Sequence, residues 1–210
     1  MKKFVIPLII CVVLILTVSA CADGDGNVYI AEDVISSVEK DSEKWAEIED
    51  MLGMLTVDSA DIPEFDGTKE AFGLFRDSLL NHMCCSSYRK YAGNSQVLDA
   101  INEENPGIDA IAAISASEFE SSMYRVFGGN VKLTHVNTEL FTYLKDSGVY
   151  VPVTSPIEGG VDFELLSVDE TENTYRIEFR SSAGDYTGSY FALLIKRDDG
   201  SCYFNLLMKH

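Results

Sequence analysis

The sequence predicts an α+β fold, in which N-terminal helices pack on a C-terminal, curved antiparallel β-meander. Up to Phe127 the apolar residues recur mostly at steps of three, four or seven, which is typical of one face of a helix. From Val149 onward they alternate with polar residues, as in strands that bury one face. The turn Asp198–Ser201 separates the last two such stretches and indicates a tight hairpin. Helices first and a meander last predict segregated α and β layers.

Four helices are expected, and they span Ala31–Leu55, Thr68–Tyr91, Ser95–Glu103 and Glu118–Phe127. A break at Asp61–Gly67 separates the first two of them. Ser117 and Glu120 have the spacing of a capping box, which predicts the start of the last helix, and Gly128 predicts its end. The short apolar segment Ile111–Ile114 fits either a strand or a helix.

Five strands are expected, at Val149–Val153, Val161–Val168, Thr174–Ser181, Thr187–Arg197 and Cys202–Met208. Short strands joined by tight turns describe an antiparallel meander. The order of helices and strands over roughly residues 30–208 resembles the cone-shaped nuclear-transport-factor-2-like and cystatin-like layouts. No linker interrupts this region, so residues 31–210 are expected to form a single domain.

The first residues have the parts of a secretory signal peptide. Lys2 and Lys3 precede an apolar run over Phe4–Val18, and small residues follow it. The run is shorter than the roughly 20 apolar residues that a membrane-spanning helix needs. We therefore expect residues 1–20 to be cleaved during export.

The stretch Val18-Ser19-Ala20-Cys21 resembles the lipobox of bacterial lipoproteins. The resemblance implies that Cys21 is lipidated, by a diacylglyceryl group and a further acyl chain such as palmitate, and anchors the protein to the outer side of the cell membrane. Two acyl chains hold a protein stably on a bilayer, whereas one holds it only marginally. Residues 21–30 are expected to be a flexible tether, because their Asp-Gly-Asp-Gly-Asn start lacks the glycine and glutamate positions of a calcium loop.

Charge and composition limit the partners of the domain. Removal of residues 1–20 takes away two lysines and no acidic residue, which changes the formal net charge from −18 to −20. Such a chain lacks the basic face that nucleic-acid binding needs, so nucleic acid is not an expected partner. Apolar residues make up 46% of the chain, which argues against disorder despite the charge.

Cysteine, histidine and glycine motifs point to no cofactor, metal or catalytic centre. Cys84 and Cys85 are adjacent and would point about 100° apart on a helix, which makes a poor chelate. We expect them to be small buried side chains, although a bridge from Cys202 to either of them remains open. The chain has no nucleophile elbow, phosphate-binding loop or dinucleotide fingerprint.

Three residues stand out as candidates for lining a pocket, namely His135, Tyr186 and Tyr190. A histidine in a cavity can act as an acid or base, although a structural histidine is the commoner case. Tyrosine combines an apolar ring with a polar tip, which suits binding surfaces and half-buried strands alike. The leading hypothesis is a membrane-tethered, non-enzymatic module that binds a protein or small ligand. The alternatives are an extracytoplasmic enzyme with a pocket on the concave sheet face and a structural subunit of an envelope assembly.

Overall fold

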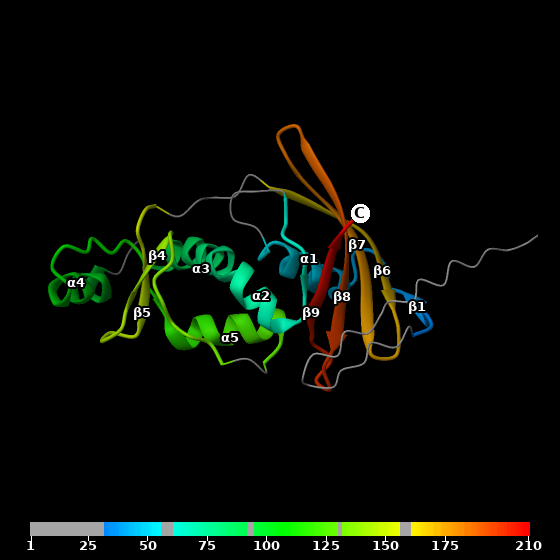
Figure 1. Ribbon diagram of the computed structural model, residues 1–210, viewed down its shortest axis with the longest axis horizontal. Coiled ribbons are helices and arrows are strands. Elements are labelled where there is room, and N and C mark those ends of the chain that lie inside the picture. The colour runs from blue at the N-terminus through cyan, green and yellow to red at the C-terminus, as the bar shows by residue number, and fades with distance from the viewer. Residues whose placement is uncertain (1–31, 56–60, 92–94, 130–131, 156–160) are drawn as a thin grey trace, which may run out of the picture. The chain divides into compact units, whose positions relative to one another are not determined.

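The computed structural model describes residues 32–55, 61–91, 95–129, 132–155 and 161–210, which Figure 1 colours along the chain. Residues Glu32–His210 form one unit that contains helices and two antiparallel sheets, so the predicted α+β class is confirmed. The expected signal peptide, Cys21 and the tether lie outside the described residues.

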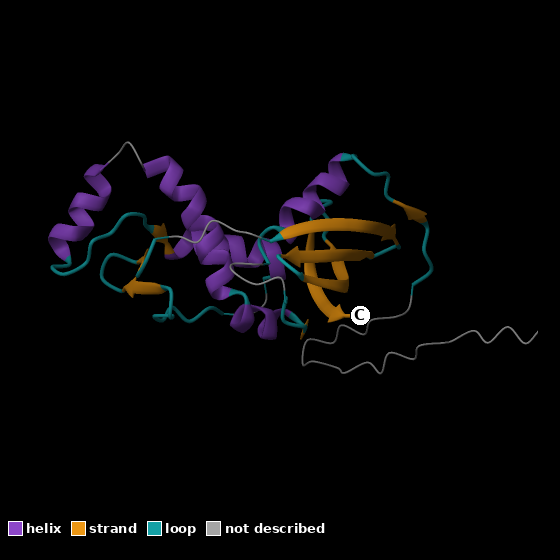
Figure 2. Cartoon of the chain, turned by 90° about the horizontal axis from the view of Figure 1, so that it is seen from above, coloured by secondary structure: helices purple, strands orange, loops and turns teal. Residues whose placement is uncertain are grey.

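The larger sheet has six strands in the order β1-β6-β7-β8-β9-β2, and its strands curve (Figure 2). Its strands are β1 (Ser36–Ser37), β2 (Phe65–Asp66), β6 (Asp162–Glu170), β7 (Thr174–Ala183), β8 (Tyr186–Lys196) and β9 (Cys202–Lys209). Four of the five expected strands form the meander β6 to β9, each within two residues of its predicted ends, whereas the first expected strand, Val149–Val153, belongs to the smaller sheet. Gly200 has φ 84° in the β8–β9 turn, a left-handed angle that glycine adopts without strain.

The two faces of this sheet differ in composition because side chains alternate along each strand. On β7 the side chains of Ile177 and Phe179 are fully buried, whereas Glu178 and Arg180 between them are exposed. The buried face joins the main hydrophobic core together with residues of helices α1, α2, α3 and α5. This face of the sheet is therefore covered by packed side chains of the helices.

The first expected helix, Ala31–Leu55, is wrong over its N-terminal half. Helix α1 spans only Glu43–Leu52, and Ser42 caps it by accepting a hydrogen bond from the Trp45 backbone N–H. Upstream, strand β1 pairs with β6, and Asp41 has a positive φ of 68° that ends any continuous helix. Pairing at the sheet edge has overridden the helical spacing of the apolar residues.

The second expected helix, Thr68–Tyr91, is divided at Phe75 into α2 (Thr68–Leu74) and α3 (Arg76–Tyr91). Phe75 has φ −106° and ψ 13°, outside the helical range, yet its N–H still bonds to the Ala71 carbonyl. Its ring is fully buried and stacks on Phe127 at a centroid distance of 5.3 Å. The break between α2 and α3 therefore lies at Phe75, whose side chain packs in the core.

Helix α5 spans Ala116–Phe127, and its capping box is formed by Ser115 and Glu118 rather than by Ser117 and Glu120. The Ser115 hydroxyl accepts from the Glu118 N–H, and the Glu118 carboxylate accepts from the Ser115 N–H, each at 3.2 Å. Both pairs of residues have the right spacing. Ser115 is the cap because it is also in strand β3, which gives it the extended backbone that a cap needs.

The smaller sheet was largely missed from the sequence. It has the order β3-β5-β4, with β3 at Ile114–Ser115, β4 at Phe141–Leu144 and β5 at Val149–Pro152. Tyr150 of β5 belongs to the main core, whereas its neighbour Val151 packs in a second cluster with residues of helix α4 (Ser95–Glu104). The small sheet therefore contributes to two separate cores, one on each face. In the described part of the chain, no helix is both long and apolar enough to cross a bilayer.

Two glycines give opposite expectations for stability. An alanine Cβ at Gly188 would lie 2.7 Å from the Tyr190 ring, which is fully buried and stacked on Phe179. We expect Gly188→Ala to lower the free energy of unfolding by about 1–3 kcal/mol, as overpacking does. Gly73 in α2 has open space around it, so Gly73→Ala should raise the same free energy by about 0.5–1 kcal/mol. Urea denaturation measures both, and equal effects of the two substitutions would contradict this packing.

Candidate functional site

The cavity of interest is a groove of about 520 Å³ between helices α3 and α5. Ligand pockets of roughly 300–1,000 Å³ are typical for small molecules. Its apolar residues are Leu79 and Met83 of α3 and Met54, which follows α1. Its polar residues are His82 of α3 together with Ser117, Glu118, Ser121, Ser122 and Arg125 of α5.

The spacing on α5 explains why these polar residues share one face. Glu118, Ser122 and Arg125 follow each other at steps of four and three residues, which places them along one side of a helix. The opposite side of α5 carries Phe119, Met123 and Phe127, which are fully buried in the core. The capping box then fixes where this polar side begins, because Glu118 belongs both to the cap and to the groove.

His82 is the titratable group of α3 in the groove. Burial lowers the pKa of its imidazole, and the positive charge of Arg125 lowers it further, while the Asp50 carboxylate acts in the opposite direction. A histidine with a lowered pKa is neutral at neutral pH and offers one donor and one acceptor nitrogen. The groove thus combines a neutral imidazole, serine hydroxyls, the Glu118 carboxylate and the Arg125 guanidinium beside apolar side chains.

His135 does not line this groove. It lies before β4, with its Nδ1 3.1 Å from the Tyr150 hydroxyl and its Nε2 3.1 Å from the Glu120 carboxylate. Its ring stacks on Tyr143 of β4 at a centroid distance of 5.0 Å. The chain Glu120–His135–Tyr150 joins α5 to the small sheet.

This chain has the order carboxylate, imidazole, hydroxyl that also occurs in catalytic triads. Its hydroxyl end is unsuited to that role because Tyr150 has no exposed surface. Burial raises the pKa of the Tyr150 phenol, so the phenolate nucleophile is disfavoured. The contacts of His135 therefore fit a structural connection between α5 and the small sheet.

Tyr186 and Tyr190 lie together on β8, away from the small-sheet contacts of His135. Their hydroxyls are 3.3 Å apart, and Tyr186 donates to the Asp61 carboxylate at 2.7 Å. Tyr190 is fully buried, and its hydroxyl accepts the Ile62 N–H at 3.0 Å. The Lys209 ammonium also contacts Asp61 and, with Tyr186, holds the pKa of that carboxyl below its usual range. Through these hydrogen bonds, Tyr186 and Tyr190 hold the segment before β2 against the large sheet.

The three described cysteines are free thiols. Cys84 and Cys202 are buried, and burial raises their pKa values to about 12 and about 11. Thiols with such pKa values are protonated and weakly nucleophilic at neutral pH. The open alternative of a bridge from Cys202 to Cys84 or Cys85 is not realised in this structure.

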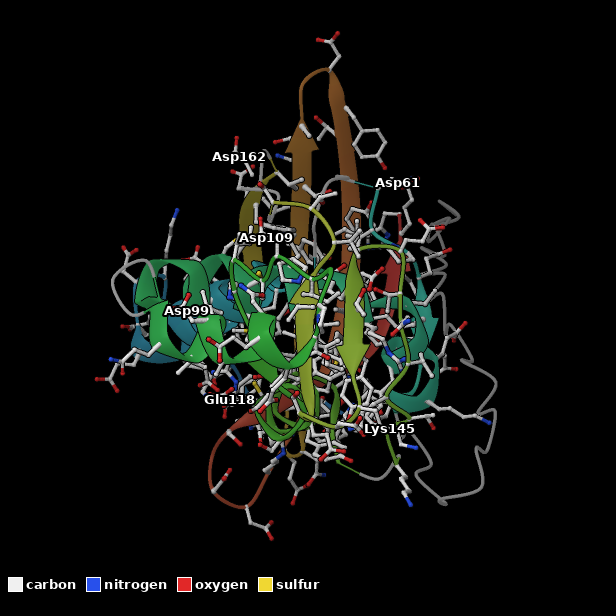
Figure 3. All side chains as sticks on the ribbon, turned by 90° about the vertical axis from the view of Figure 1, so that its left-hand side faces the viewer. Asp61, Asp99, Asp109, Glu118, Lys145 and Asp162 are labelled. Carbon is white, nitrogen blue, oxygen red and sulfur yellow. The ribbon has the colours of Figure 1, made fainter. Side chains whose placement is uncertain are left out.

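Acidic side chains are spread over the surface. The labelled Asp61, Asp99, Asp109, Glu118 and Asp162 lie in different parts of Figure 3. Within the described residues, no three histidine, cysteine, aspartate or glutamate side chains gather closely enough to hold a metal ion. The negative charge therefore has the distribution expected of a solvated surface.

Sequence reasoning missed the groove, because its two sides are separated by more than thirty residues that include α4 and β3. The available signal was the series Ser117, Ser121 and Arg125, spaced by four residues along one predicted helix. That series indicates a polar stripe, which most surface helices also have. Only the packing of α3 beside α5 turns the stripe into one wall of a cavity.

The structural role of His135 can be tested by substitution. His135→Ala removes one hydrogen-bond partner of the buried Tyr150 hydroxyl, so the free energy of unfolding should fall by about 1–3 kcal/mol. His210→Ala, at the C-terminal end, is the control and should have little effect. Urea denaturation measures both, and an unchanged stability of His135→Ala together with loss of a catalytic activity would instead favour the enzyme alternative.

Comparisons with known protein families, curated proteins and solved structures find no match to this chain.

Proposed function

We propose that this protein is a lipid-anchored, extracytoplasmic binding module whose ligand occupies the groove between α3 and α5. The groove is the observation that carries the proposal, because it combines apolar side chains with several convergent polar groups. The signal peptide and the lipobox-like Val18–Cys21 support the location.

A binding role is favoured over catalysis by the arrangement of the reactive groups. The Glu120–His135–Tyr150 chain ends in a buried phenol, and the buried thiols of Cys84 and Cys202 are held protonated. In the groove the Ser121 hydroxyl donates to the Ser117 carbonyl, as an ordinary helical serine does. These contacts fit a site that holds a ligand without transforming it.

The lipid anchor predicts that Cys21 carries the acyl groups. In cells grown with an alkyne analogue of palmitate, the wild-type protein should be labelled and Cys21→Ser should not. Cys85→Ser removes a different thiol and should keep the label. Intact mass of the purified wild-type protein should show Cys21 as its first residue. An unlabelled wild-type chain, or label that persists in Cys21→Ser, would contradict the anchor.

Ligand binding in the groove is measured on the soluble chain 22–210, since the described core lies entirely within Glu32–His210. In amide NMR spectra, a ligand from a small-molecule library should shift the signals of Leu79, His82 and Ser122 first. Ser121→Tyr fills the groove with a larger side chain and should abolish those shifts. Thr187→Tyr on the exposed surface of β8 is the control and should retain them. Ligand-induced shifts that avoid the groove, or turnover of the ligand, would overturn the proposal.

A further inference from the structure

Arg125 is the basic side chain that α5 places in the groove. Its Nη2 lies 3.3 Å from the thioether sulfur of Met54, which is a weak hydrogen-bond acceptor. Among the residues that the structure describes, no carboxylate lies within ion-pair distance of this guanidinium. Arg125 is exposed to solvent, and in the mature chain acidic residues outnumber basic ones by 20, so a guanidinium that no described carboxylate neutralises can attract an anionic ligand.

Arg125 is also not needed to cap its own helix. A cation near a helix C-terminus normally interacts with the last carbonyl groups. At the end of α5 this role belongs to Arg197, which donates to the Tyr124 carbonyl at 2.6 Å and to the Arg125 carbonyl at 3.3 Å. The guanidinium of Arg125 is therefore available to the groove.

The surroundings of Arg125 match a ligand with two chemically different parts. Ser122 lies one helical turn before Arg125, and within the described residues its hydroxyl has no hydrogen-bond partner, so both can donate to one anionic group. Leu79, Met54 and Met83 provide an apolar surface beside them. Methionine side chains are flexible and adapt to irregular apolar shapes.

The net negative charge of the domain also affects how an anionic ligand would bind. Acidic side chains across the surface repel an anion at a distance, and salt at physiological strength screens this repulsion beyond about 8 Å. At short range a charge-assisted hydrogen bond from a guanidinium is roughly twice as strong as a neutral one. Burial of an apolar ligand body then adds to the affinity in proportion to its area.

We propose that the groove between α3 and α5 takes a small organic anion with an apolar body, whose carboxylate or phosphate group binds Arg125 and Ser122. This inference rests on the proposed function and adds the chemical class of the ligand.

The experiment titrates three probes with the same eight-carbon body into the labelled chain 22–210. Octanoate and octyl phosphate carry the two candidate head groups, and octanamide is their neutral counterpart. Amide shifts of Leu79, His82 and Ser122 give the dissociation constants. We expect at least one anion to bind about tenfold or more tightly than octanamide, the difference expected between charged and neutral hydrogen bonds.

Two variants with the same change in charge assign the effect to one residue. Arg125→Gln should bring the affinity for the anions down to that for octanamide. Arg180→Gln removes an exposed arginine that pairs with Glu164 on the large sheet, and it should keep the wild-type preference. The amide spectra of both variants also show directly that they are folded.

The outcomes separate this inference from the function on which it rests. Equal affinity for all three probes at the groove would overturn the anionic ligand while leaving a binding groove. A preference for anions that survives Arg125→Gln would overturn the assignment to Arg125. If none of the three probes shifts the groove signals, while another ligand does so without dependence on Arg125, the anionic class is wrong. If no ligand of any kind shifts them, the binding function fails as well.

Discussion

The ring of Phe127, at the last position of α5, packs against aromatic rings from both the other helices and the large sheet. It lies 5.3 Å from Phe75 at the kink between α2 and α3, 5.8 Å from Phe65 of β2 and 6.5 Å from Phe204 of β9. These rings are buried, and aromatic pairs at such distances add to the stability that burial alone provides. Aromatic rings from the α2–α3 junction, from α5 and from the large sheet therefore meet at Phe127.

The two ends of α5 are held by different interactions that act on the same helix. At its start, the Ser115–Glu118 capping box connects it to strand β3 of the small sheet. At its end, Arg197 reaches from the β8–β9 hairpin to its last carbonyl groups. A helix fixed at both ends presents its polar side in a constant position. The groove is formed because α3 packs beside this helix, as part of the same core.

The polar networks away from the groove have a structural role, because their hydrogen bonds hold loops in place. Glu32 accepts hydrogen bonds from Asn173 in the β6–β7 turn, and this holds the beginning of the described chain to the sheet. A hydrogen bond from the Thr171 hydroxyl, together with those from Asn173, lowers the pKa of the Glu32 carboxyl, which keeps it ionised. Asp61 with Tyr186, and His135 with Glu120, hold two further loops in the same manner. These hydrogen bonds connect loops at the edges of the domain to its helices and sheet.

The sequence by itself determined the α+β class, the meander from β6 to β9 and the ends of α4, because alternation, helical spacing and turn residues are local signals. Where two local signals competed, tertiary contacts decided. Residues Ser36–Ser37 pair with a sheet edge rather than extend α1, and Ser115 rather than Ser117 caps α5 because it is also a strand residue. Of the small sheet only β5 was predicted from the sequence, and the two-residue β3 and the four-residue β4 were missed. The groove escaped prediction because its two walls come from helices distant in sequence, and no local pattern records which helices pack side by side.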